Sequence, residues 1–381
     1  MEQNVKEIID AAFEATRGVT ERFDREWFLR TAKTGGNTQD MWKAMADQGL
    51  LGLGVPEEFG GFGEGVTGPT AVMEAMSEAG VPSFLYIVTA FGRTAILKGG
   101  TAEQKRRWVP STVTGERKTC FALTEPGAGT NSFNMSTKAE RTESGYRING
   151  QKMFISGADE ADGMFVVART NQMGSPAEVS LFMVELPAKG ITLQQLDIDM
   201  YAPERQFSVF FDDVEVPADA RLGEEGQGKQ LLFDALNPER FMIAAWAIGL
   251  GNLAIKKGSD YARTRSPFGA PIGSYQAIQH PLAHAKMNLD AARLMLYDGC
   301  AEYDRGESVG LKANMAKYLA SEAARQAIEA AIQVHGGHAW DKTTDVIQLW
   351  PQIRLMLQSP INNEMILNFV SERLLDLPRS Y

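Results

Sequence analysis

The feature that most constrains the fold is a change in hydrophobic periodicity near Lys118. Before this point apolar residues recur at helical spacing, as in residues 8–13. From there to about residue 230 they alternate or form short runs bounded by turn residues, as in residues 164–168, which is typical of strands. The helical spacing returns at about Leu231. The pattern therefore predicts an all-β unit between two helical units.

The sequence thus predicts an α+β multidomain protein. We expect an N-terminal α-helical domain over residues 1–117, a middle β-barrel or β-sandwich domain over 118–230, and a C-terminal four-helix bundle over 231–381. The 381 residues are enough for two or three domains, and 44% hydrophobic with 23% charged residues is an ordinary globular composition.

Local signals refine this division of the chain. The glycine-dense stretch 52–65 predicts a loop, and residues 101–105 resemble a capped helix start. Residues 142–146 indicate a hairpin turn. Residues 207–211 are expected to form a strand that ends in a turn at Asp212 and Asp213.

Charge and composition argue against several classes of protein. A net charge of −10 disfavours a nucleic-acid surface, and the one dense basic run, residues 105–107, suits a solvated helix face. No apolar run approaches the ~20 residues that span a bilayer, and the polar first residues differ from a signal peptide, so a cytoplasmic protein is expected. Cys120 and Cys300 match no redox or metal motif and are expected to be free thiols.

Two patterns that could indicate ligand sites favour structural roles instead. Residues 249–254 fit the dinucleotide fingerprint G-x-G-x-x-A but lie inside a helical segment, where small residues favour close packing. His280 and His284 have the i, i+4 spacing of zinc ligands but lack a third ligand, so no metal site is predicted.

A longer pattern carries a more specific signal. Residues 121–132 (FALTEPGAGTNS) pass from an apolar strand into small polar residues and glycines, which allow a backbone to approach a flat polar ligand. This stretch resembles the flavin-binding signature of the acyl-CoA dehydrogenase family. Further matches cover nearly the whole chain and lie at residues 55–61, 152–156, 265–269 and 333–337.

The resemblance implies an FAD-dependent enzyme that converts an acyl-CoA thioester to the trans-2-enoyl-CoA and passes electrons to an electron-transferring flavoprotein. Thr130, Asn237 and Arg240 match positions that contact substrate. The positions that resemble the family's cofactor contacts are Phe121, Leu123, Thr124, Thr130, Phe154, Ile155, Ser156, Arg265, Phe268, Gln276, Gln333, Gly336 and Gly337.

The resemblance also implies an oligomer. In this family, the positions that match Arg265, Phe268, Gln276 and residues 333–337 grip the dinucleotide across a subunit interface. A permanent guanidinium charge suits phosphate, and paired glycines admit close backbone approach. A homodimer or homotetramer is therefore expected.

The catalytic base is where the chain departs from most of the family. Most members carry a Glu near the C-terminus, and the matching position here is Pro360, which has neither a carboxylate nor a backbone N–H. Ser359 and Gln358 remain alternative sources of the missing donor. A minority, including isovaleryl-CoA dehydrogenase, has the base just before an Arg on a helix, and Glu239 before Arg240 fits that arrangement. A helix-start Glu stabilised by the helix dipole is the alternative.

Two other functions remain open on the same scaffold. One is a flavin monooxygenase or oxidase. Slow reoxidation of the reduced flavin in air would argue against this function. The other is a partner subunit of a hetero-oligomeric acyl-CoA dehydrogenase, motivated by Pro360. The flavin content of the protein expressed alone separates that reading from an active enzyme.

Overall fold

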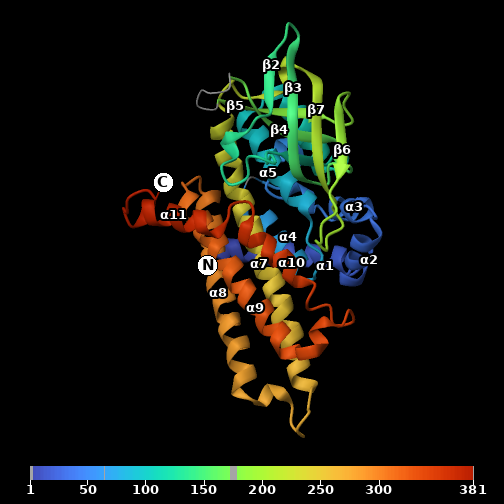
Figure 1. The fold of residues 1–381 in the computed structure, drawn as a ribbon, viewed down its shortest axis with the longest axis vertical. Coiled ribbons are helices and arrows are strands. Elements are labelled where there is room, and N and C mark those ends of the chain that lie inside the picture. Colours follow the sequence, from blue (N-terminus) through green and yellow to red (C-terminus); the bar gives the residue numbers. More distant parts are fainter. Residues whose placement is uncertain (1–2, 64, 172–177, 381) are drawn as a thin grey trace.

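The computed structural model describes residues 3–63, 65–171 and 178–380, and it places a β-domain at one end of a long helical body (Figure 1). The first part of the chain is helical, with 3-10 turns in the glycine-dense loop as predicted. The predicted helix start is a capping box, in which Thr101 and Gln104 satisfy each other's backbone N–H groups. The N-terminal helices are α1 (Gln3–Thr20), α2 (Arg25–Thr34), α3 (Gln39–Asp47), α4 (Thr67–Glu78), α5 (Phe84–Gly99) and α6 (Ala102–Val113).

The middle domain is an 8-stranded sheet in the order β6-β7-β3-β2-β4-β5-β8, with β1 paired to β4 in parallel. The predicted turn at residues 142–146 is confirmed, because Thr142 N donates to Gly145 O over 2.9 Å between β2 and β3. The strands are β1 (Thr119–Ala122), β2 (Lys138–Arg141), β3 (Gly145–Ser156), β4 (Gly163–Arg169), β5 (Val179–Glu185), β6 (Ile191–Gln195), β7 (Gln206–Pro217) and β8 (Arg221–Leu222).

The predicted turn at Asp212 and Asp213 is wrong. Strand β7 runs through both residues to Pro217, and its pairing with β3 continues beyond them. The register shifts at this point, and Asp213 takes a left-handed conformation with φ 48. The two carboxylates therefore mark a bulge within a strand, which places polar residues outward without ending the pairing.

Three long helices dominate the C-terminal part and lie side by side in Figure 1. Gly249 of the fingerprint-like segment lies within α7, where an added Cβ would come within 2.5 Å of Glu74 O, so the glycine is required for contact with α4. The packing interpretation of residues 249–254 is confirmed. The helices are α7 (Gly228–Thr264), α8 (Gln276–Asp304), α9 (Gly310–His335), α10 (Leu349–Gln358) and α11 (Asn363–Leu374).

One hydrophobic core joins the N-terminal helices to the C-terminal bundle, and a second core fills the sheet. A buried carboxylate fixes the two helical parts to each other: Glu74 of α4 accepts from Arg293 Nε (2.6 Å) and from Tyr297 Oη (2.5 Å) of α8. Cys120 and Cys300 are buried free thiols, as predicted. Among the helices of the described residues, none has the length and apolarity to cross a membrane. The predicted order of helical, β and helical domains is confirmed.

Candidate active site

The glycine-containing segment after β1 is attached to β3 through its backbone. Met153 N donates to Thr124 O over 2.8 Å, and Lys152 Nζ donates to Leu123 O over 2.9 Å. Phe121 is half-buried and stacks edge-on with Phe91 of α5 at a centroid distance of 5.0 Å. The segments 121–124 and 152–156, which lie far apart in sequence, are therefore neighbours in the fold.

A buried ion pair holds the start and the end of the segment together. The Glu125 carboxylate accepts from Ser136 N (2.6 Å) and Thr137 N (2.9 Å), and it pairs with Lys152 Nζ at 2.9 Å. Burial alone would raise the pKa of Glu125, but the Lys152 charge and these hydrogen bonds outweigh it and lower the pKa to about 2. The intervening loop, which carries Thr130, is thus closed by an ionised carboxylate.

Phe154 is presented by a local distortion of β3. The register between β3 and β7 shifts between Lys152 and Ile155, and Phe154 adopts φ 60, which costs a non-glycine residue about 1–3 kcal/mol. Its side chain is 54% exposed, whereas Ile155 is buried in the sheet core. The bulge therefore turns the Phe154 ring outward. Ile155, also predicted to contact the cofactor, has its side chain in the sheet core and can offer only its backbone.

The loop between β1 and β2 also touches the helical part of the chain. Asn362, the N-cap residue of α11, donates its Nδ2 to Thr130 Oγ1 over 3.2 Å. Phe133 lies 6.0 Å from Phe233 of α7 between ring centroids. The predicted Thr130 region, the beginning of α7 and the beginning of α11 therefore meet at one place.

Glu239 lies in α7 about one turn after Leu236, and one oxygen of its carboxylate is withdrawn from water. Its Oε2 is buried and has no hydrogen-bond partner among the described residues. Burial raises the pKa of Glu239 to about 7, and the neighbouring Arg240 only partly opposes this effect. A carboxylate with this pKa can exchange a proton near neutral pH.

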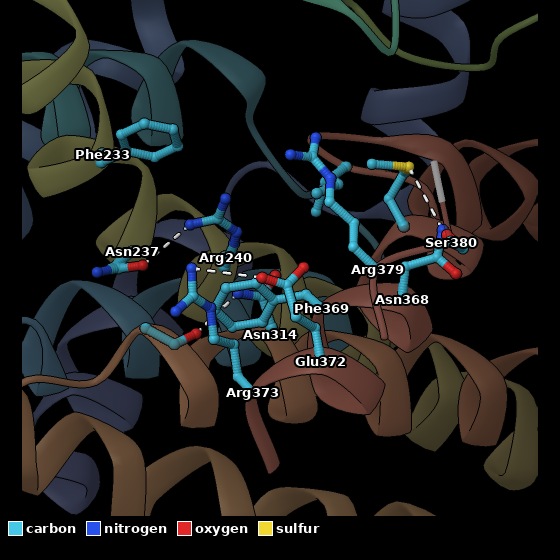
Figure 2. A pocket seen from close by; sticks show the side chains of 13 residues that line it. Phe233, Asn237, Arg240, Asn314, Asn368, Phe369, Glu372, Arg373, Arg379 and Ser380 are labelled. Carbon is cyan, nitrogen blue, oxygen red and sulfur yellow. Dashed lines mark hydrogen bonds and ion pairs between the residues drawn. The ribbon is translucent and has the colours of Figure 1, made fainter. Parts of the chain in front are cut away.

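Arg240 and Asn237 line a cavity of about 440 Å³ (Figure 2). Both residues are close neighbours of Glu239 in α7. Arg240 is buried and donates Nη1 to Asn237 Oδ1 over 2.9 Å, while its Nε has no partner among the described residues. Figure 2 shows Arg240 from α7 and Arg373 from α11 approaching the same space. Arg379 of the C-terminal tail also lines it. Three arginines therefore line the cavity together with one carboxylate, Glu372, which lies 3.6 Å from Arg373.

Sequence reasoning missed Lys317 of α9, which holds the segment around Pro360. Its Nζ is buried and donates to Ile361 O (2.7 Å) and Asn363 Oδ1 (2.8 Å). Burial lowers the pKa of Lys317 to about 7. A lysine within the alanine-rich stripe of α9 is the signal that could have indicated a buried cation.

The remaining predicted cofactor residues lie at the other end of α7. Arg265 ends this helix, and Ala262, Leu282 and Val334 form a small core that brings the end of α7, the start of α8 and the end of α9 together. The residues at this end are exposed, namely Arg265, Phe268, Gln276, Gln333, Gly336 and Gly337. At ~1.5 Å per residue, Arg265 lies roughly 39 Å from Glu239 along the helix. One chain therefore presents its predicted site residues as two separate groups.

Comparison with known proteins agrees with this arrangement. The chain matches three domain families in order. These are the acyl-CoA dehydrogenase N-terminal domain over residues 4–116, the middle domain over 120–214 and the C-terminal domain over 226–375. The chain therefore belongs to the acyl-CoA dehydrogenase family. This confirms the predicted family and fold class, and it makes the chain an FAD-dependent oxidoreductase.

Individual relatives cover almost the whole chain. It is 40% identical over 363 residues to the acyl-CoA dehydrogenase FadE12 of Mycobacterium tuberculosis (strain ATCC 25618 / H37Rv), with 94% of each chain covered. The solved structure of butyryl-CoA dehydrogenase from Megasphaera elsdenii has a TM-score of 0.91 at 25% identity and covers 98% of this chain and 99% of that one. The FAD complex of PigA has a TM-score of 0.90 at 26% identity and covers 98% of both chains.

The residues present suit a flavin. The outward ring of Phe154 and the half-buried residues Phe121, Leu123 and Thr124 come from two segments joined by the Met153–Thr124 hydrogen bond, so they offer apolar and polar groups to a flat heterocycle. A strained bulge that exposes an aromatic side chain has no value for the core of the sheet itself, and it is the kind of distortion that persists at functional sites.

Proposed function

We propose that this protein catalyses α,β-dehydrogenation of an acyl-CoA thioester, with Glu239 as the base that takes the α-proton. The observation that carries the proposal is the buried, unpartnered Oε2 of Glu239, whose helix neighbours Asn237 and Arg240 line the cation-rich cavity. FAD, when bound, accepts the β-hydride. The family membership of the chain and the lack of a carboxylate at Pro360 support Glu239 over the usual position.

Glu239 would act through its environment. Desolvation keeps the pKa of this carboxyl near 7, so the carboxylate form is available at neutral pH and is a stronger base than an exposed Glu. Arg240 is locked by Asn237 and fixes the helix turn that carries Glu239. The proton moves from the substrate α-carbon to a Glu239 oxygen, and water is kept away by the surrounding side chains.

The cavity beside Arg240 suits the CoA portion of the substrate. Arg240, Arg373 and Arg379 supply positive charge for phosphate, while Phe233 and Ile361 supply apolar surface for a pantetheine-like chain. Thr130 and Asn362 lie at the boundary between this cavity's helices and the β-domain loop, where the thioester would cross. Electron transfer to an electron-transferring flavoprotein completes the proposed cycle.

The two groups of predicted cofactor residues support an oligomer. The exposed group around Arg265 lies at the far end of α7 from Glu239, so it would serve the flavin of a second copy of the chain. A homodimer is the smallest assembly that satisfies this geometry.

Oxidase and monooxygenase chemistry is distinguished by rapid reoxidation of the reduced flavin in air.

The decisive experiment is single-turnover flavin bleaching with Glu239→Gln. The substitution keeps size and polarity but removes the proton acceptor, so FAD and acyl-CoA should still bind while flavin reduction slows by roughly 10²–10⁴-fold. Asp234→Asn, a half-buried carboxylate on the same helix that pairs with Gln230, is the matched control and should reduce at the normal rate. An unchanged reduction rate in Glu239→Gln would show that another group is the base.

A further inference from the structure

A second cavity, of about 370 Å³, lies on a different face of α7 and shares no lining residue with the first. It is bounded by α5, α7, the start of α4 and the end of α8. Pro238 and Met242 form its α7 wall, whereas Asn237 and Arg240 line the first cavity. The two spaces are therefore separated by the helix that carries Glu239, and the second one is unused by the proposed reaction.

Arg93 of α5 is the notable group in this cavity. Its side chain is 4% exposed, its Nη1 donates to Leu51 O, and its Nε has no hydrogen-bond partner among the described residues. Arg93 forms no ion pair within the described part of the chain, and its one titratable neighbour there is the buried Tyr86. Burial lowers the pKa of Arg93 to about 10, which leaves the guanidinium protonated at neutral pH. A buried cation without a counter-ion is costly unless something else pairs with it.

Two carboxylates line the cavity among the described residues, and both are bound to other partners. Asp304 accepts from Val66 N (2.6 Å) and Thr67 Oγ1 (2.5 Å) and so caps α4, while Glu307 pairs with Arg305 Nε at 2.7 Å. Neither is recorded as a partner of Arg93. Among the described lining residues, Arg93 and Lys98 are the cations. The two carboxylates offset their charge, so a ligand with two or more negative charges is disfavoured.

The lining of the cavity mixes apolar and polar residues. Leu53, Pro69, Ala90, Leu97 and Met242 are apolar, whereas Thr94, Lys98, Tyr303, Asp304 and Glu307 are polar or charged. A volume of 370 Å³ falls within the range of small-molecule pockets, which combine apolar walls with a few polar anchors. A buried guanidinium beside the apolar residues of this lining matches a single planar carboxylate attached to a short hydrocarbon chain.

We infer that the Arg93 cavity is a binding site for a small aliphatic monocarboxylate, separate from the acyl-CoA site. The carboxylate accepts from the Arg93 guanidinium, and the hydrocarbon part packs on Leu97 and Met242. The inference does not depend on the identity of the catalytic base. Pro238 and Met242 flank Glu239 in α7, so an occupied cavity also braces the helix turn that carries the candidate base.

The test is calorimetric titration of the FAD-loaded protein with sodium hexanoate up to about 10 mM, a range that detects millimolar affinity. Arg93→Gln should weaken hexanoate binding by roughly 10–100-fold, since a charge-assisted hydrogen bond contributes about 1.5–3 kcal/mol. Ala90→Leu, which fills the cavity while keeping Arg93, should also abolish binding. Arg106→Gln on the exposed face of α6 is the control and should bind normally.

Hexanamide, which has the same length but no charge, should bind at least roughly tenfold more weakly than hexanoate. Three results would overturn the inference: no hexanoate binding by the unaltered protein, equal binding of hexanamide, or hexanoate binding that survives both Arg93→Gln and Ala90→Leu. The last result would place the carboxylate elsewhere, and displacement by an acyl-CoA would then identify the substrate cavity as its site. Because the titration needs no turnover, its outcome is independent of Glu239→Gln.

Discussion

Removal of the Glu125 carboxylate should destabilise the β-domain substantially. Glu125 and Lys152 have side chains that are 3% and 0% exposed, and the pKa of Glu125 falls from an ordinary 4.5 to about 2. At about 1.4 kcal/mol per pH unit, this difference corresponds to roughly 3 kcal/mol of folding free energy at neutral pH. Glu125→Gln also leaves the Lys152 ammonium buried without its partner, so a loss of about 3 kcal/mol is expected.

The sign of the pH dependence follows from the lowered pKa. The stabilisation is fully present above about pH 4.5 and is lost as the pH falls from 4.5 toward 2, because the folded chain must then protonate a carboxylate that it holds ionised. The unaltered protein should therefore lose up to roughly 3 kcal/mol of unfolding free energy over this interval relative to Glu125→Gln.

Equilibrium urea unfolding followed by circular dichroism measures both effects. Glu140→Gln is the matched control, because the Lys138–Glu140 pair lies in the same domain but has side chains that are 50% and 56% exposed. Such exposed pairs contribute at most about 1 kcal/mol. If Glu125→Gln costs no more than Glu140→Gln at pH 7, the ion pair does not hold the loop closed and the reasoning is wrong.

Three further predictions follow from other parts of the molecule. Arg265→Ala should weaken FAD retention at least roughly tenfold and shift gel filtration toward smaller species, whereas Arg263→Ala, whose partner is Asp260, should do neither. The rate of flavin reduction should rise about tenfold per pH unit below pH 7 and level off above it, since the raised pKa of Glu239 of about 7 requires deprotonation before catalysis; a flat profile from pH 5.5 to 8.5 contradicts Glu239 as the base. Gly249→Ala should lower the free energy of unfolding by about 1–3 kcal/mol because its Cβ meets Glu74 O, whereas Gly310→Ala, with open space around it, should leave it unchanged in thermal denaturation.

The order of domains was predictable because hydrophobic periodicity reports directly on how a segment buries its apolar face. The capped start at Thr101 and the turn before Gly145 were predictable because both depend on residues adjacent in sequence. The strand through Asp212 and Asp213 was missed because a bulge lets polar residues lie inside a paired strand, which local sequence does not distinguish from a turn.

The chemistry of the site was less accessible to pattern reasoning. Phe154 matched a family position, but its outward orientation depends on the register of β3 against β7, which is a tertiary property. Lys152, Lys317 and Arg93 are all buried charges, and a periodicity rule assigns charges to the surface. Their partners come from distant segments or, for Arg93 Nε, from none of the described residues, so only the folded arrangement reveals them.

The choice between Pro360 and Glu239 is best understood through the cations around them. Arg240 and Lys317 are both buried close to the 359–363 segment. Lys317 donates two hydrogen bonds, to Ile361 O and Asn363 Oδ1. With proline at position 360, that segment carries no carboxylate and offers backbone oxygens, the Ser359 hydroxyl and the amide oxygens of Asn362 and Asn363. Glu239, adjacent to Arg240 in α7, partly offsets the Arg240 charge, whereas the carboxylates that act on Lys317 are Glu364 and Glu322. Burial raises the pKa of Glu239 to about 7. Glu239 on α7 therefore balances part of the buried positive charge, and we propose it as the base because Pro360 has no carboxylate.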